Sequence, residues 1–119
     1  MSVLVAVGES QEGKAALAAA IAEAERLGTG LVVMNLALRP LKLGPLPTDL
    51  QVRTVERMGP DDRDPAEAVL DEIAADATIE RLVIGVKKRR PIGKALLGSI
   101  SQRLLLEADI PVLAIKVVG

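Results

Sequence analysis

Two apolar runs near the start of the chain constrain its fold most strongly. Ser2–Val7 and Leu31–Leu36 consist almost entirely of aliphatic and β-branched residues, without the alternation that marks a strand exposed on one face. Strands buried on both faces of a parallel sheet have this continuous apolar pattern. Both runs are therefore predicted to be central parallel strands. Asn35, near the end of the second run, is expected to be a hydrogen-bonded polar residue.

A helix is predicted between these two runs. Ser10 is a suitable N-cap after the break at Gly8, and Gly28 is placed to end the helix after about Leu27. The many alanines of this segment allow the helix to lie close to a sheet. Its apolar residues recur at three- and four-residue spacing, at Ala16, Leu17, Ala20, Ile21, Ala24 and Leu27.

The segment after the second strand contains many residues that break helices. Ala37–Leu50 carries three prolines and a glycine, which predicts an extended loop. The loop is either a plain connection, which is the more frequent case, or a lid over a ligand site. Gln51–Met58 then alternates apolar and polar residues, as a strand at a sheet edge does.

Asp64–Glu67 predicts the start of a second helix. Asp64 is a suitable cap, Pro65 occupies the first helical position, and Glu67 stands where a capping box requires an acidic residue. The buried face of this helix is expected to consist of Val69, Leu70 and Ile73.

The stretch Leu82–Ser99 joins a strand to a helix through a strongly basic loop. The strand is predicted over Arg81–Gly85, and the loop carries four consecutive cations at positions 87–90 and a fifth at Lys94. A helix over Ser99–Ala108 follows, and Pro111–Val118 is the last predicted strand. The residues of this helix expected to face inward are Ile100, Leu104 and Leu105.

Five strands that alternate with helical segments predict an α/β fold. The sheet is expected to be open and largely parallel, with helices on both faces and right-handed crossovers. The chain of 119 residues is long enough for one core, so residues 1–119 are predicted to form a single domain. In such sheets ligands bind at the carboxyl ends of the strands, where the basic loop lies.

The basic loop and the helix start that follows it form a candidate site for an anionic ligand. A phosphate would be stabilised there by the unpaired N–H groups and the positive end of the helix, together with Lys87, Lys88 and Arg89. The alternative interpretation from these residues is a basic loop that only faces water.

Composition excludes several kinds of chemistry. The chain contains no cysteine, histidine, phenylalanine, tyrosine or tryptophan, so it lacks thiols, the usual general base and zinc ligands, and aromatic platforms for bases. Glu9 and Asp109 could position water for ATP hydrolysis, but neither belongs to a base and nucleophile pair, so the chain is not expected to be an enzyme. Asp61, Asp62 and Asp64 could bind a cation, although a solvated acidic turn with Asp64 as helix cap is favoured, and no metal is implied.

Charge and hydropathy limit the partners and the location. The net charge is −1, so no nucleic-acid partner is expected. The first apolar run is too short for a signal peptide or a membrane span, which predicts a cytoplasmic protein with no membrane partner.

The layout of the whole chain resembles the universal stress protein family. The phosphate-binding pattern of that family is a glycine, two residues, a glycine, nine residues, a glycine, and then serine or threonine. Gly85 stands at the first position, Gly98 and Ser99 complete the pattern, and Lys88 stands where the second glycine is expected. The segment Ala108–Leu113 is similar to the last helix-to-strand turn of the family.

This resemblance implies an adenine nucleotide alpha hydrolase-like fold with strand order 3-2-1-4-5. It also implies a homodimer, often made through the last strand. Val112–Val118 supports this expectation, because it is a long apolar strand with Lys116 as its only charge. The alternative is that other parts of the same chain cover this strand.

The sequence departs from the family at two positions of the site. Nucleotide-binding members typically carry an aspartate just after the first strand, where this chain has Gly8, although Ser10 is retained. Glycine at the second motif position lets the backbone approach a phosphate, whereas Lys88 carries a side chain whose ammonium could compensate. The resemblance implies ATP or another adenine nucleotide as the ligand, with Leu36 against the adenine, at a site made of Gly8, Leu36, Gly85, Lys87, Lys88, Arg89, Gly98, Ser99 and Ile100.

Two functions follow from these observations. In the first, the chain is a stress-response regulatory protein that binds a nucleotide or another phosphate ligand at the Gly85–Ser99 loop. In the second, it is a dimeric interaction module that binds no nucleotide and uses the basic loop to dock an acidic protein partner. Restoring aspartate at position 8 and glycine at position 88 would create ATP affinity under the second hypothesis and only improve it under the first.

Overall fold

The computed structural model describes residues 1–8, 10–37, 39–56, 64–88, 95–96 and 98–118, with the side chains of 88, 95, 96 and 118 left aside. Strands and helices alternate along most of the chain, as the sequence predicts. In chain order the elements are β1 (Ser2–Val7), α1 (Gln11–Leu27), β2 (Gly30–Asn35), β3 (Val52–Glu56), α2 (Pro65–Ala75), β4 (Ile79–Lys88), β5 (Ala95–Leu96), α3 (Ser99–Glu107) and β6 (Val112–Val118).

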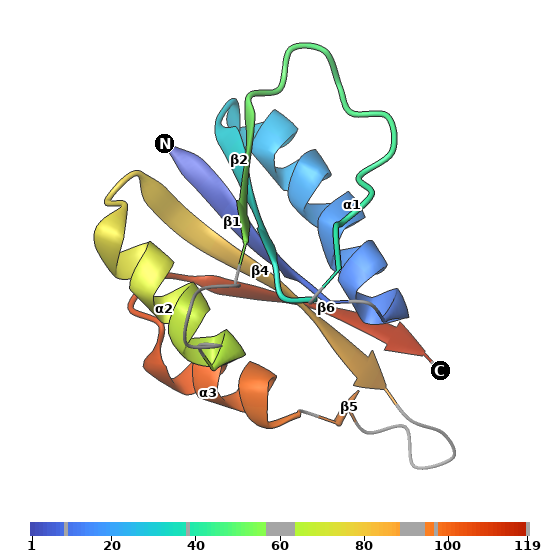
Figure 1. Cartoon of the computed structure of the whole chain (residues 1–119), viewed down its shortest axis with the longest axis vertical. Coiled ribbons are helices and arrows are strands. Elements are labelled where there is room, and N and C mark those ends of the chain that lie inside the picture. Colours follow the sequence, from blue (N-terminus) through green and yellow to red (C-terminus); the bar gives the residue numbers. More distant parts are fainter. Residues whose placement is uncertain (9, 38, 57–63, 89–94, 97, 119) are drawn as a thin grey trace.

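The long strands form one open parallel sheet in the order β3-β2-β1-β4-β6 (Figure 1). Val5 of β1 pairs with Val33 of β2 on one side and with Val83 of β4 on the other, so β1 is a central strand. The predicted order 3-2-1-4-5 is confirmed, with β6 as the fifth long strand. The sheet also contains β5, a two-residue strand that pairs antiparallel with the end of β4 and was not predicted.

Helices cover both faces of the sheet, α1 on one face and α2 with α3 on the other (Figure 1). Because side chains alternate along a strand, Leu4 and Ala6 of β1 contribute to the core beneath α2 and α3, whereas Val3 and Val5 contribute to the core beneath α1. All four are buried. Full burial of a valine or leucine side chain contributes roughly 1.5–3 kcal/mol, so the continuous apolar runs stabilise both layers at once.

The ends of α1 are where the sequence places them. Ser10 stands at the N-cap position, although its side chain makes no capping hydrogen bond, and Gly28 ends the helix in the left-handed conformation with φ of 68°. A glycine adopts this conformation without the cost that a Cβ would impose. Ala16, Ala20 and Ala24 have no exposed surface. Because these side chains are small, the helix axis lies close to the sheet. The predicted caps and the predicted alanine face are confirmed.

The start of α2 is also confirmed. The backbone N–H of Glu67 donates to Oδ2 of Asp64 at 3.1 Å, and Pro65 occupies the first helical position. Val69 is fully buried, and Leu70 and Ile73 pack partly buried against the same core. The predicted acids at 61 and 62 lie outside the described residues.

The connection between β2 and β3 has no helix or strand in its described residues, as predicted. Leu41, Leu43 and Leu50 pack against the core on the α1 side. Val52–Glu56 lies at the sheet edge predicted for Gln51–Met58, while positions 57 and 58 are outside the described part of the chain.

The prediction that β4 ends at Gly85 is wrong. The strand continues to Lys88, because β6 pairs with it from Leu82 to Lys88 and β5 pairs with Lys87 and Lys88. Since β6 already occupies one edge of β4, β5 must pair with the other edge, the one that β1 uses further down. Lys87 and Lys88 are therefore strand residues flanked on both sides, and not loop residues. The remaining basic residues, Arg89 among them, lie outside the described segments.

The inward face of α3 is narrower than predicted. Leu104 is buried at 1% exposure, whereas Ile100 and Leu105 are each 37% exposed. Leu105 is one residue beyond Leu104 and is therefore rotated by about 100° around the helix. Ile100 lies in the first turn, at the carboxyl edge of the sheet. The prediction that these two side chains face inward is wrong.

Candidate functional site

A small hollow lies where the carboxyl ends of β1 and β4 meet. From this point the chain leaves β1 towards α1 on one face of the sheet and leaves β4 towards α3 on the other face (Figure 1). Ligands of open α/β sheets bind in the crevice at such a reversal. The hollow has a volume of about 100 Å³ and is lined by Ala6, Gly8, Ser10, Glu12, Gly13, Leu36, Ile84, Gly85 and Ser101.

Leu36 is held at this hollow by the end of β2. Its backbone N–H donates to the carbonyl oxygen of Val7 at 2.8 Å. The side chain of Asn35, which is fully buried, fixes the turn that follows: Oδ1 accepts from the N–H of Ala37 at 2.9 Å, and Nδ2 donates to the carbonyl of Arg39 at 2.7 Å. Nδ2 also donates to Oε2 of Glu56 at 2.9 Å. The expectation that Asn35 is a hydrogen-bonded polar residue is confirmed.

Gly85 allows the first turn of α1 to rest directly on the sheet. A Cβ built on Gly85 would lie 2.1 Å from the carbonyl oxygen of Glu12, a distance that no real Cβ can adopt. Gly13 is equally confined, because its Cβ would lie 2.8 Å from the carbonyl oxygen of Gly8. Because both positions are glycine, the start of α1 can lie directly against the ends of β4 and β1. The first glycine of the motif is therefore required by packing.

Gly98 differs from Gly85, because the packing does not require a glycine there. Its φ of −65° and ψ of 165° are open to any residue, and a Cβ built on it would have no atom within 4 Å. Gly98 is the N-cap of α3, and its carbonyl accepts from the N–H of Gln102 at 2.9 Å. The N–H groups of the three residues between them have no partner within the helix. These N–H groups form the positive end of α3, and Ser101 of this first turn lines the hollow.

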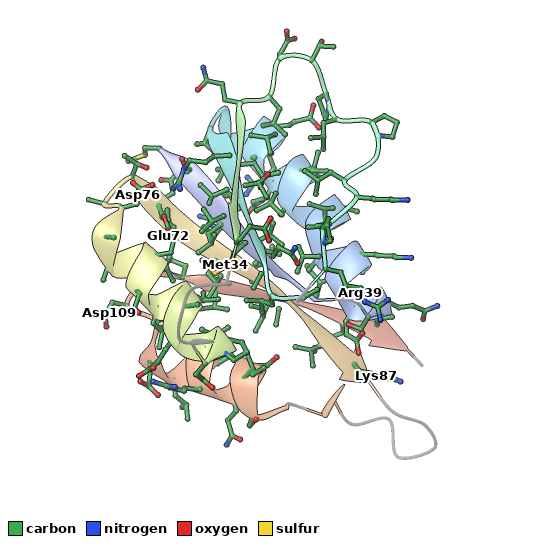
Figure 2. The ribbon with its side chains drawn as sticks, in the orientation of Figure 1. Met34, Arg39, Glu72, Asp76, Lys87 and Asp109 are labelled. Carbon is green, nitrogen blue, oxygen red and sulfur yellow. The ribbon has the colours of Figure 1, made fainter. Side chains whose placement is uncertain are left out.

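A second hollow of about 210 Å³ adjoins the first and is lined by Ser10, Gln11, Glu12, Lys87 and Val117. Ser10 and Glu12 line both hollows. Lys87 is exposed near the end of β4 (Figure 2). A hydrogen bond from the Ser10 hydroxyl lowers the pKa of the Glu12 carboxyl, assisted by the N–H of Glu12 itself and by the charge of Lys87, while partial burial opposes the shift.

The structure brings together only part of the predicted set. Gly8, Leu36 and Gly85 line the first hollow, and Lys87 lines the second. Gly98, Ser99 and Ile100 form the exposed start of α3. The side chain of Lys88 and the whole of Arg89 lie outside the described residues.

Several residues of the two hollows were not in the predicted set. Gln11, Glu12 and Ser101 are the polar ones, together with Ser10, which the sequence marks as a helix cap and as a residue retained from the family pattern. Two helices begin at the carboxyl edge of the sheet, and each carries a polar residue in its first turn. This pattern could have identified Glu12 and Ser101 from the sequence.

A larger hollow of about 380 Å³ lies at the opposite edge of the sheet, beside the end of α1, and includes Gly28, Thr29 and Gly30. It lies at the amino end of β2, away from the strand ends at which ligands of such sheets bind. The smaller hollows are the better candidates, because the first turn of α3, a lysine and two serines converge on them.

The described residues contain no group of three or more histidine, cysteine, aspartate or glutamate side chains placed to hold a metal ion. Within the same segments, no helix is both long and apolar enough to cross a membrane.

An open, doubly wound α/β domain with a crevice between β1 and β4 defines the adenine nucleotide alpha hydrolase-like fold. A universal stress protein from Archaeoglobus fulgidus superposes with a TM-score of 0.72 at 24% identity, covering 98% of each chain. The universal stress protein from Archaeoglobus fulgidus in complex with dAMP gives a TM-score of 0.66 at 20% identity, again covering 98% of each chain. These two likenesses establish the fold.

Sequence comparison establishes the family. The model of the universal stress protein family matches residues 51–116. A universal stress protein of Mycolicibacterium smegmatis is 38% identical in an alignment that covers 95% of this chain and 97% of that protein. The chain belongs to the universal stress protein family.

Proposed function

We propose that this chain is a stress-response regulatory protein that binds an adenine nucleotide, or another ligand with a phosphate, at the carboxyl ends of β1 and β4. The observation that carries the proposal is the start of α3. Gly98 is a glycine that packing does not require, at the N-cap of a helix whose first N–H groups have no partner within the helix, and this helix start reaches the hollow of Gly8 and Leu36 through Ser101. A glycine in such a place lets a phosphate approach the backbone closely.

The parts of the ligand would take different parts of the site. The phosphate would accept hydrogen bonds from the N–H groups at the start of α3 and from the hydroxyl of Ser99, with Lys87 and its basic neighbours supplying positive charge. Leu36 would contact the adenine. A hydrogen bond to a charged group contributes roughly 1.5–3 kcal/mol, so a few of them support micromolar affinity. The related Archaeoglobus fulgidus protein solved with dAMP supports an adenine nucleotide as the ligand class. The proposal is one of binding and includes no catalytic step.

The second candidate is an interaction module that binds no nucleotide. Two observations favour it. The described part of the first hollow encloses about 100 Å³, whereas pockets for small molecules usually enclose roughly 300–1,000 Å³. The backbone of Lys87 and Lys88 is paired with β5 and β6, which removes it from phosphate binding. The basic segment would then dock an acidic protein partner.

We further propose that two chains form a homodimer through β6. This strand ends the sheet, so its outer edge offers backbone N–H and C=O groups for pairing. Apolar side chains are also exposed on β6 itself and on the helix that precedes it in the chain. The exposed large hydrophobic residues among those described are Met1 together with four from α3 and β6, namely Ile100, Leu105, Leu106 and Leu113.

A calorimetric titration separates the two candidates. Nucleotide-free protein is titrated with AMP, cyclic AMP and ATP with Mg²⁺, and the same titrations are run on Gly98→Val and on the control Thr54→Val. Both positions are exposed, but Thr54 lies on β3 at the far edge of the sheet. The nucleotide proposal expects micromolar binding that Gly98→Val weakens at least about tenfold and that the control leaves unchanged. Absence of binding to every nucleotide favours the interaction module.

A further inference from the structure

We propose that Glu12 sets the amount of negative charge that the ligand can carry, so that the site favours a ligand with one phosphate over one with a chain of phosphates. This inference rests on the proposed function, because it concerns the ligand of the same site. It follows from the position of Glu12, from the groups that hold it, and from the cation that it faces.

Glu12 stands between the two hollows and lines both. Its backbone is fixed against the sheet by the close contact with Gly85. The Ser10 hydroxyl and the N–H of Glu12 lower the pKa of its carboxyl. The carboxyl is therefore ionised at neutral pH and places a negative charge at the start of α1.

The position of this carboxylate changes what the start of α1 can do. The amino end of a helix attracts anions through its open N–H groups and its positive dipole. Glu12 is the acidic residue in the first turn of α1, and its own carboxylate already takes up part of that attraction. In contrast, the first turn of α3 carries no acidic residue. A ligand phosphate therefore meets one helix start without an acidic residue and one whose attraction is already partly offset by Glu12.

Glu12 also acts on Lys87. Both residues line the second hollow, and the positive charge of Lys87 contributes to the lowered pKa of the Glu12 carboxyl. A lysine that faces a carboxylate offers less net attraction to a phosphate. A chain of phosphates that extends from α3 towards Lys87 would have to approach Glu12, and the two like charges would repel each other. A single phosphate at the start of α3 avoids this repulsion.

The test compares AMP with ATP on the full chain. The two nucleotides are titrated by calorimetry, without Mg²⁺, into the unchanged protein, into Glu12→Gln and into the control Glu25→Gln. The control removes the same charge from the other end of α1. We expect Glu12→Gln to raise the affinity for ATP on the order of tenfold and the affinity for AMP less than about threefold. Glu25→Gln should leave both affinities unchanged.

The outcomes separate this inference from the proposed function. If AMP binds but the ratio of ATP to AMP affinity is the same in Glu12→Gln and the unchanged chain, Glu12 does not select charge and the inference fails alone. If neither nucleotide binds to any chain, the proposed function fails as well. Should Glu12→Gln not fold, Glu12→Ser carries the same expectation, because serine is favourable near a helix start.

Discussion

The backbone of Glu12 lies so close to Gly85 that a Cβ on Gly85 would be 2.1 Å from the Glu12 carbonyl oxygen and 2.8 Å from the Glu12 Cβ. This contact fastens the first turn of α1 to β4. It also places Ser10 and Glu12 at the candidate site.

The first prediction concerns this contact. Gly85→Ala forces backbone atoms apart, so it should lower the free energy of unfolding by about 3 kcal/mol or more, the upper end of the usual cost of overpacking. Gly98→Ala adds the same methyl group where nothing lies within 4 Å, so it should cost only the weaker capping by alanine at a helix N-cap, about 1 kcal/mol. Urea unfolding of both variants measures the difference. Equal losses in the two would contradict the packing role of Gly85.

A second prediction concerns the two departures from the family pattern. A Cβ at position 8 would meet no atom within 4 Å, so the fold can accept an aspartate there. The double variant Gly8→Asp and Lys88→Gly should therefore fold, and it should bind ATP at least about tenfold more tightly than the unchanged chain. Gly8→Asn combined with Lys88→Gly is the matched control without the added charge. Unaltered ATP binding in the aspartate variant would show that these positions do not limit the site.

A third prediction concerns pH. A hydrogen bond from Arg26 lowers the pKa of Glu23 below its ordinary 4.5, and a hydrogen bond from Arg81 adds to this effect. Hydrogen bonds from Thr78 lower the pKa of Asp76 below its ordinary 3.8. The pKa of Glu12 is lowered as well.

The sign of the effect follows from proton binding. Because these carboxyls hold protons less tightly in the folded chain, the unfolded chain takes up protons first as the pH falls. Their stabilisation is complete above the ordinary pKa values and is lost as the pH drops through the lowered ones. Urea unfolding should show this loss below about pH 4.5, and a smaller loss in Glu23→Gln. Stability that stays constant into this acidic range would contradict the assignment.

The sequence predicted the sheet and most helix ends correctly because those features depend on local patterns. The continuous run Ser2–Val7, the cap pair Ser10 and Gly28, and the box from Asp64 to Glu67 each specify their element within a few residues. The order of the strands came from resemblance to a family and agrees with the observed sheet.

The end of β4 could not be predicted in the same way. Lys87 and Lys88 belong to a run of charged residues, which by itself indicates a loop. They are part of a strand because β6, which comes much later in the chain, pairs with them. Gly85 and Gly98 look alike in a motif, yet only the fold shows that Gly85 is confined by Glu12 and that Gly98 is not. The position of Glu12 in the first turn of a helix is visible in the sequence. Only the fold shows that Glu12 and Lys87 line the same hollow.

A fourth prediction concerns the dimer. Leu113 is 38% exposed on the edge strand β6, and an aspartate there would place a charge in the proposed interface. Light scattering at micromolar concentration should give a dimer for the unchanged chain and a monomer for Leu113→Asp. Thr54→Asp, on β3 at the opposite edge, should remain a dimer. A monomeric unchanged chain would contradict the proposal.

The central claim, a phosphate ligand at the start of α3, is tested most directly by amide NMR of the uniformly labelled chain during titration with AMP. The signals of Gly8, Gly85 and 98–101 should shift together and saturate at one concentration, while those of Thr29 and Gly30, beside the opposite hollow, should stay in place. Shifts confined to the opposite hollow, or no shift at any residue, would contradict the claim.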